Sequence, residues 1–117
     1  MSTRAVYTFV DAHDKFHVYK HWDNYPERED NTEVGAYAFI RQAKGLAWEM
    51  PRFEASEFAT AFIAKHKQEG GGVYLSKGAR YHGDLSYHYT IRQKGDKLEV
   101  KCKDMYDPTN KIPTVLI

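Results

Sequence analysis

Six histidines are the side chains of this chain best suited to bind a metal ion or to transfer a proton. His13, His17 and His21 recur every four residues, but the alternation of polar and apolar residues around them predicts a strand. On a strand only His17 and His21 of one hairpin arm share a face, about 13 Å apart at ~3.3 Å per residue. Zinc needs three or four converging ligands, so a site would also require His82 and His88. We keep a metal site at His17, His21, His82 and His88 as an alternative, prefer surface imidazoles, and expect no cofactor.

A second pattern is that of a divalent-metal nuclease. Asp84 is followed fifteen residues later by Glu99, with Lys101 two positions beyond it. Nucleases of the PD-(D/E)xK kind place such carboxylates on neighbouring strands to hold the metal, while the lysine steadies the attacking water. Gly83 stands where those enzymes carry proline. A nuclease or hydrolase using Asp84, Glu99 and Lys101 is therefore an alternative, and we expect no catalytic residues.

Two further chemistries have less support. Cys102 alternates with Leu98 and Val100, which predicts a core thiol and no nucleophile. Basic and aromatic residues that could contact single-stranded nucleic acid form a third alternative. They are Lys65, Lys67, Lys77, Arg80, Tyr74 and Tyr81.

The composition indicates one folded domain over residues 1–117. Seventeen Lys and Arg against sixteen Asp and Glu give a net charge of +1, so nucleic acid is not the expected partner. The sequence has no long apolar segment and a single cysteine, so we expect no membrane contact and a cytoplasmic location in the host cell. Aromatic residues make up 15% of the chain, nine of them tyrosine, which is typical of binding surfaces and of half-exposed sheets.

Hydrophobic periodicity predicts two hairpins and two helices. Alternation over 4–10 and 16–22 predicts the first hairpin, and alternation over 85–92 and 98–105 predicts the second. Three-to-four spacing predicts a helix ending near Leu46, capped by Asp30, Asn31 or Thr32, and a second helix ending at residues 65–67. With a further short strand at 73–75, this order predicts an α+β fold. We expect an antiparallel sheet with a possible C-terminal edge strand and both helices on one face.

Two segments carry a resemblance to a group of proteins. Residues 3–9 lead to the sequence His-Trp-Asp-Asn-Tyr-Pro at 21–26, and a later Gly-Asp pair opens the strand at 83–89. These segments resemble small uncharacterised phage and prophage proteins, in which a strand precedes a His-aromatic-Asp-Gly-Tyr-Pro turn. Asn24 stands at the usual glycine. The resemblance implies a mobile-element origin and an α+β fold, and no activity.

The function expected from these features is that of a non-enzymatic protein-interaction module that modulates a host protein. The turn at 21–26 and the tyrosines of the sheet combine the residue types enriched in binding hot spots. The expected binding residues are Tyr19, His21, Trp22, Asp23, Tyr25, Tyr87 and Tyr89.

The C-terminal tail, residues 112–117, predicts a homodimer. Ile112, Val115, Leu116 and Ile117 are apolar, and burying each is worth roughly 1.5–3 kcal/mol. Because Pro113 weakens pairing within the chain, we expect these residues to contact a second copy. Light scattering should give a dimeric mass for the intact chain and a monomeric mass for a chain ending at Lys111. A monomeric intact chain at micromolar concentration would contradict the prediction.

Overall fold

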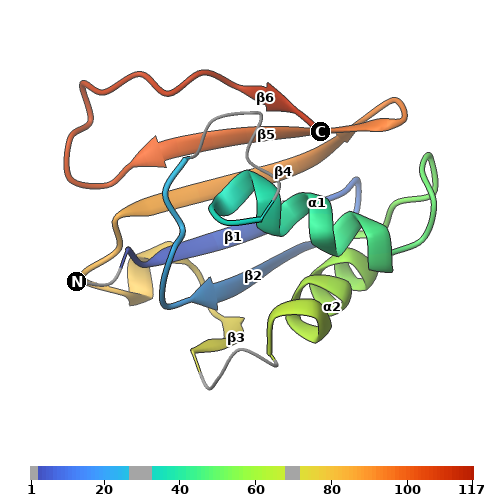
Figure 1. Cartoon of the computed structure of the whole chain (residues 1–117), viewed down its shortest axis with the longest axis horizontal. Helices are drawn as coiled ribbons and strands as arrows, with labels where there is room; N and C mark the ends of the chain where they lie inside the picture. The colour runs from blue at the N-terminus through green and yellow to red at the C-terminus, as the bar shows by residue number, and fades with distance from the viewer. Residues whose placement is uncertain (1–2, 27–32, 68–71) are drawn as a thin grey trace.

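The computed structural model describes residues 3–26, 33–67 and 72–117 and contains a six-stranded sheet covered by helices (Figure 1). The α+β class is confirmed. The strands are β1 (Ala5–Val10), β2 (Lys15–Lys20), β3 (Val73–Ser76), β4 (Tyr87–Lys94), β5 (Lys97–Asp104) and β6 (Val115–Leu116). The helices are α1 (Ala36–Leu46), α2 (Ala55–His66) and the short 3-10 helix η2 (Ala79–Tyr81).

The sheet is mixed, so the prediction of a purely antiparallel sheet is wrong. The strand order is β3-β2-β1-β4-β5-β6, and β1 and β4 are parallel, with Tyr7 opposite Tyr89. Both predicted hairpins, β1–β2 and β4–β5, are present. After β3 the chain crosses over β2 and β1 before it enters β4, and parallel neighbours require such a crossover. Periodicity identifies strands but does not show which strands are neighbours in the sheet, and this explains the wrong prediction.

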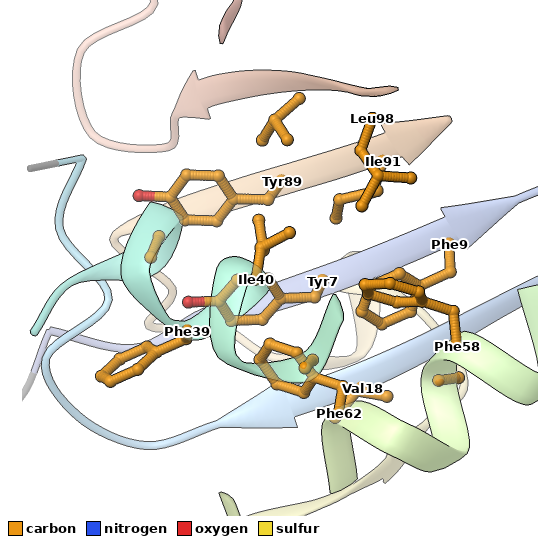
Figure 2. Packing of buried hydrophobic residues seen from close by; sticks show 14 of the residues in the cluster. Tyr7, Phe9, Val18, Phe39, Ile40, Phe58, Phe62, Tyr89, Ile91 and Leu98 are labelled. Atoms are coloured by element: carbon orange, nitrogen blue, oxygen red, sulfur yellow. The ribbon is translucent and has the colours of Figure 1, made fainter. Parts of the chain in front are cut away.

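The helices pack on the sheet face that carries the larger aromatic side chains. Tyr7 and Phe9 of β1 contact Phe62 of α2, with ring centroids 4.6 and 5.6 Å apart. Tyr89 of β4 stacks on Tyr7 at 5.1 Å, and Figure 2 shows their hydroxyl groups pointing the same way. These rings lie within the main core, so the tyrosines of β1 and β4 stabilise the fold through burial.

The turn between β1 and β2 holds the start of α2. Glu54, at the N-cap position, makes no side-chain cap. The carboxylate of Asp11 accepts the backbone N–H of Ala55 at 2.7 Å, and also those of His13 and Asp14. These bonds lower the pKa of Asp11, the Ala55 bond most. A carboxylate at this position also complements the helix dipole.

The crossover between β3 and β4 covers part of the other sheet face. Leu85 and Ala79 pack against Val6 and Tyr19, so Leu85 lies on the face opposite the helices, although the alternation over 85–92 would place it on the same face as Tyr87. Every residue of β1 is buried. The central strand is therefore covered on both faces, by helices on one and by the crossover on the other.

Asn24 fastens the end of β2 to the two central strands. Its side-chain N–H groups donate to the carbonyls of Thr3 and Lys20 at 2.8 and 2.9 Å. Its side-chain oxygen accepts from Tyr7 Oη, and its backbone carbonyl accepts from Tyr89 Oη, both at 2.6 Å. Asn24 is fully buried. A buried amide in which each polar group is paired fixes the path of the chain at this turn.

The C-terminal tail adds to the outer edge of β5 as β6. Leu98 and Ile117 exchange two backbone hydrogen bonds, of 2.7 and 2.8 Å. Val115 is buried, Ile112 and Ile117 are partly buried, and Leu116 is exposed. The possible edge strand is thus present within the chain. The homodimer stays a prediction, with Leu116 as the tail side chain most available for it.

The predicted cap of the first helix at residues 30–32 falls outside the described residues, and Gly35 occupies the N-cap position of α1. In the described parts of the chain no helix has the length and apolar character needed to cross a membrane.

Replacing Asn24 by alanine should destabilise the protein by roughly 2–4 kcal/mol, because three buried side-chain hydrogen bonds are lost. Asp23→Gly is the matched control in the same turn. Asp23 has φ of 62°, a conformation that glycine adopts freely, so this change should leave stability unaltered or raise it by up to about 1 kcal/mol. Urea unfolding followed by circular dichroism measures both. Equal stabilities of the two variants would contradict the role given to Asn24.

Candidate functional site

The sequence-predicted histidines meet on the sheet face opposite the helices, in two pairs. The first pair joins β2 to β4 through a threonine. Thr8 Oγ1 lies 2.8 Å from His17 Nδ1 and 2.8 Å from His88 Nε2. A hydroxyl has only one hydrogen to donate, so at least one ring must present an N–H to it. The three side chains form a continuous hydrogen-bonded row across the sheet.

Both rings of this row resist protonation. Burial lowers the pKa of His88, with further contributions from His17, Lys103 and Lys15. Burial also lowers the pKa of His17, and Lys15 adds to the effect. Two charged rings around one hydroxyl would repel each other. The two imidazole rings of the row are therefore uncharged at physiological pH. Uncharged rings suit a structural polar contact or a proton acceptor.

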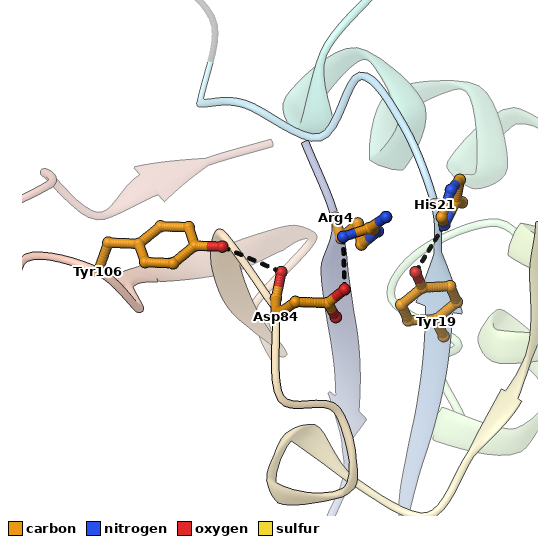
Figure 3. A network of polar contacts seen from close by, with 5 residues as sticks. All are labelled: Arg4, Tyr19, His21, Asp84 and Tyr106. Atoms are coloured by element: carbon orange, nitrogen blue, oxygen red, sulfur yellow. Dashed lines mark hydrogen bonds and ion pairs between the residues drawn. The ribbon is translucent and has the colours of Figure 1, made fainter. Parts of the chain in front are cut away.

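The second pair of histidines is joined through Tyr19. Its hydroxyl lies 2.7 Å from His21 Nδ1, a contact visible in Figure 3. Its ring stacks on His82 with centroids 4.6 Å apart and an interplanar angle of 15°. Burial, and next the neighbouring Tyr74, raise the pKa of Tyr19, so the phenol stays protonated and able to donate.

His82 also contacts a serine. Its Nε2 lies 2.7 Å from Ser76 Oγ, and that oxygen accepts the backbone N–H of Gly78 at 3.1 Å. Ser76 ends β3, so the contact holds the turn that enters the crossover. A serine beside a histidine can form part of a nucleophilic catalytic site when a third group orients the histidine. Among the described residues no acidic side chain contacts His82 to orient it.

The nuclease residues lie apart. Asp84 forms an ion pair with Arg4, and its carbonyl accepts from Tyr106 Oη (Figure 3). Glu99 lies opposite Arg92 and contacts Lys101 at 3.8 Å. The five residue steps of β4 from Tyr87 to Arg92 alone span about 16 Å. Asp84 therefore lies at one end of the β4–β5 hairpin and Glu99 towards the other.

Among the described residues no group of three or more histidine, cysteine, aspartate or glutamate side chains could hold a metal ion. His17 and His88 share Thr8, and His21 and His82 share Tyr19, so the four predicted ligands are paired and do not converge. Burial raises the pKa of Cys102 to about 12, in keeping with the core thiol that its alternation predicted.

The residues predicted to bind a partner are mostly part of the packing. Tyr89 is fully buried, and Tyr87 is partly buried beside it on the helix-covered face. Tyr19 is buried on the other face. Alternation does not show which face the helices cover, so the sequence predicts Tyr87 and Tyr89 as binding residues although both face the helices.

The predicted turn at 21–26 presents fewer groups than its composition suggests. Trp22 packs on Gly72, where a Cβ atom would collide with its ring. The carbonyl of Trp22 accepts from Nζ of the buried Lys20 at 3.1 Å. Only Asp23 and Tyr25 are exposed, and the carbonyl of Tyr25 accepts the first N–H of α1. The turn therefore contributes to packing through Trp22 and its backbone, and its role in binding stays a prediction.

Large exposed side chains gather instead at the β3 end of the sheet, a surface that we call the β3 margin. Leu75 is 65% exposed, Tyr81 55% and Tyr74 45%. Between β3 and α2 lies a groove of about 310 Å³. Its lining is Phe16, Ser56, Ala59, Thr60, Ile63, Ala64 and Leu75. Leu75 was not predicted as a binding residue; the available signal was a leucine on a very short strand between a glycine run and a turn.

Comparison of the chain with protein-family models, with curated proteins and with solved structures gives no significant match.

Lowering the pH should destabilise the fold through the histidine row. The pKa values of His17 and His88 are lowered in the folded chain, so the unfolded chain binds more protons near its ordinary histidine pKa of ~6.5. The contribution of these two histidines to the stability of the fold is complete above about pH 6.5. It falls as the pH drops from there through the pKa values of the folded chain. Thermal unfolding at about pH 7.5 and 5.5 should show a lower Tm at the acidic pH.

His88→Gln should reduce this pH dependence, whereas His13→Gln, a change at an exposed histidine outside the row, should preserve it. The carboxylates with lowered pKa, Asp11 and Asp104, act near and below about pH 4, outside this window. A Tm that drops equally in wild type and His88→Gln would show that the row does not carry the effect.

Proposed function

We propose that the protein is a non-enzymatic binding module that contacts another protein through the β3 margin. The observation that carries the proposal is the exposure of Leu75 in an apolar groove on the helix-covered face, with Tyr74 and Tyr81 exposed on the other face at the same edge of the sheet. Exposed apolar and aromatic groups at one edge of a sheet are typical of protein contacts.

The partner we propose is a host protein, which follows from the resemblance to phage and prophage proteins. A modulator of this kind needs a specific surface and no catalytic centre. The dispersed positions of Asp84 and Glu99, and the absence of an acid beside His82 in the described residues, favour binding over hydrolysis.

Single-stranded nucleic acid is the second candidate, because one observation favours it. The guanidinium of Arg80 lies 5.1 Å from the ring centre of Tyr81 and donates to its hydroxyl at 3.0 Å. A tyrosine beside a cation can stack on a base. Such binding would weaken steeply with salt.

Affinity capture from a bacterial lysate tests the proposed function. The wild-type chain should retain a protein that a Tyr74→Ala/Tyr81→Ala variant retains at least about fivefold less, since truncating hot-spot aromatics costs 1 kcal/mol or more. Tyr106→Ala is the matched control, an exposed tyrosine (71%) away from the margin. Tyr25→Ala separately measures the contribution of the turn.

Capture that is equal for wild type and the double variant would contradict the assignment to the β3 margin. Loss of capture after nuclease treatment of the lysate would favour the nucleic-acid candidate instead.

A further inference from the structure

β3 is an outer strand whose free edge has backbone groups available for hydrogen bonding. It pairs only with β2, and its Leu75 lies opposite Val18. His21 N donates to the carbonyl of Gly72 at 3.0 Å, which identifies the residues of β3 that bond to β2. Antiparallel pairs alternate between bonded and non-bonded, so Tyr74 and Ser76 bond to β2 while Val73 and Leu75 direct their peptide groups outwards.

These outward groups are largely unused in the described part of the chain. The carbonyl of Val73 accepts from Lys67 Nζ at 2.9 Å. No described group bonds to the N–H or the carbonyl of Leu75. An extended segment of another chain could therefore pair with β3 through Leu75, as in recognition by strand addition.

The groove beside this edge suits the side chains of an added strand. Side chains of a strand alternate between its two faces, so every second residue of an added strand would point towards α2. There it would meet Phe16, Ala59, Ile63 and Leu75, with a volume of about 310 Å³ to fill. That volume is at the lower end of the range of ligand pockets, ~300–1,000 Å³. The position calls for an apolar side chain.

The charged side chains around the groove indicate which charge the two ends of a bound segment should carry. Lys65 and Lys67 follow the groove at the end of α2, and Lys77 follows β3; all three are exposed. In the described residues no carboxylate forms an ion pair with them. Acidic residues flanking the apolar position would complement this rim. A second copy of β3 would bring its own lysines to the same edge, where like charges repel.

We propose that the edge of β3 and the groove against α2 bind an extended acidic segment of a partner protein, which adds to the sheet as a strand and inserts an apolar side chain between β3 and α2. The inference rests on the proposed function and specifies its binding mode. Nucleic acid is disfavoured at this position because neither the outward peptide groups of Leu75 nor the apolar groove suits a phosphate backbone.

Fluorescence anisotropy with labelled peptides tests the proposal on the full chain. The probe is a short peptide that alternates threonine with leucine or valine and carries two glutamates at each end. It should bind at least about tenfold more tightly than the same peptide with lysine ends. N-methylation should abolish binding for the set of alternate amides that faces β3 and should be tolerated for the other set. Equal affinity for the two charge forms, or binding that survives methylation of each set in turn, would overturn the proposal.

Two variants at one position separate the backbone contact from the side-chain contact. Leu75→Pro removes an N–H that points away from β2, so it should abolish binding while circular dichroism shows a folded chain. Leu75→Ala keeps the N–H and should weaken binding only partly. Leu116→Ala, on the opposite edge of the sheet, should have no effect. If proline disrupts folding, Lys77→Glu decides the question, because it should reduce the preference for glutamate ends over lysine ends, and an unchanged preference would overturn the proposal.

The remaining outcomes each identify another occupant. A dimer in light scattering that Leu75→Pro abolishes would assign the edge to a second copy and overturn the inference. Salt-sensitive binding of a labelled oligothymidylate, without peptide binding, would do the same in favour of nucleic acid. If no peptide binds while protein capture still depends on Tyr74 and Tyr81, strand addition is wrong and the proposed function stands.

Discussion

The buried side chain of Asn24 is the contact on which the arrangement of the sheet depends. The side chain donates to the carbonyls of Thr3 and Lys20 and accepts a hydrogen bond from Tyr7. The backbone carbonyl of Asn24 accepts a hydrogen bond from Tyr89. β1, β2 and β4 therefore meet at one residue. Buried polar groups stabilise a fold only when they are paired, and here Tyr7 pairs with the side-chain oxygen of Asn24 while Tyr89 pairs with its backbone carbonyl. The two tyrosines must therefore lie side by side. That requirement is met when β1 and β4 are neighbours and parallel.

The same constraint decides which aromatic residues remain available for binding. With Tyr7 and Tyr89 directed at Asn24, the face that carries them must lie under α1 and α2. The crossover then covers β1 from the other side and buries Tyr19. Tyr74, Leu75 and Tyr81 of the β3 margin stay exposed because β3 is an outer strand of the sheet.

The histidines show how a pattern suggestive of catalysis serves packing in this chain. His17 and His88 satisfy the hydroxyl of the buried Thr8, and His82 stacks on Tyr19 while contacting Ser76. Each of these three rings connects two elements on the sheet face opposite the helices. The arrangement links the stability of the sheet to pH, because the contacts of His17 and His88 require uncharged rings. This layer also reaches the β3 margin, because Tyr74 packs on Tyr19 and Ser76 contacts His82.

The helices, both hairpins and the partly buried Cys102 could be predicted from the sequence, because they follow from periodicity within a few residues, whereas the C-terminal edge strand was only a possibility. The sequence did not determine that β4 lies parallel to β1, because strand order depends on the path of the crossover and on the contact of Tyr7 and Tyr89 with Asn24. For the same reason it assigned Tyr87 and Tyr89 to a binding face. Alternation separates the two faces of a strand, and only the packing of the helices decides which face is buried. The apolar groove at Leu75 lies between α2 and β3, so it exists only in the tertiary structure.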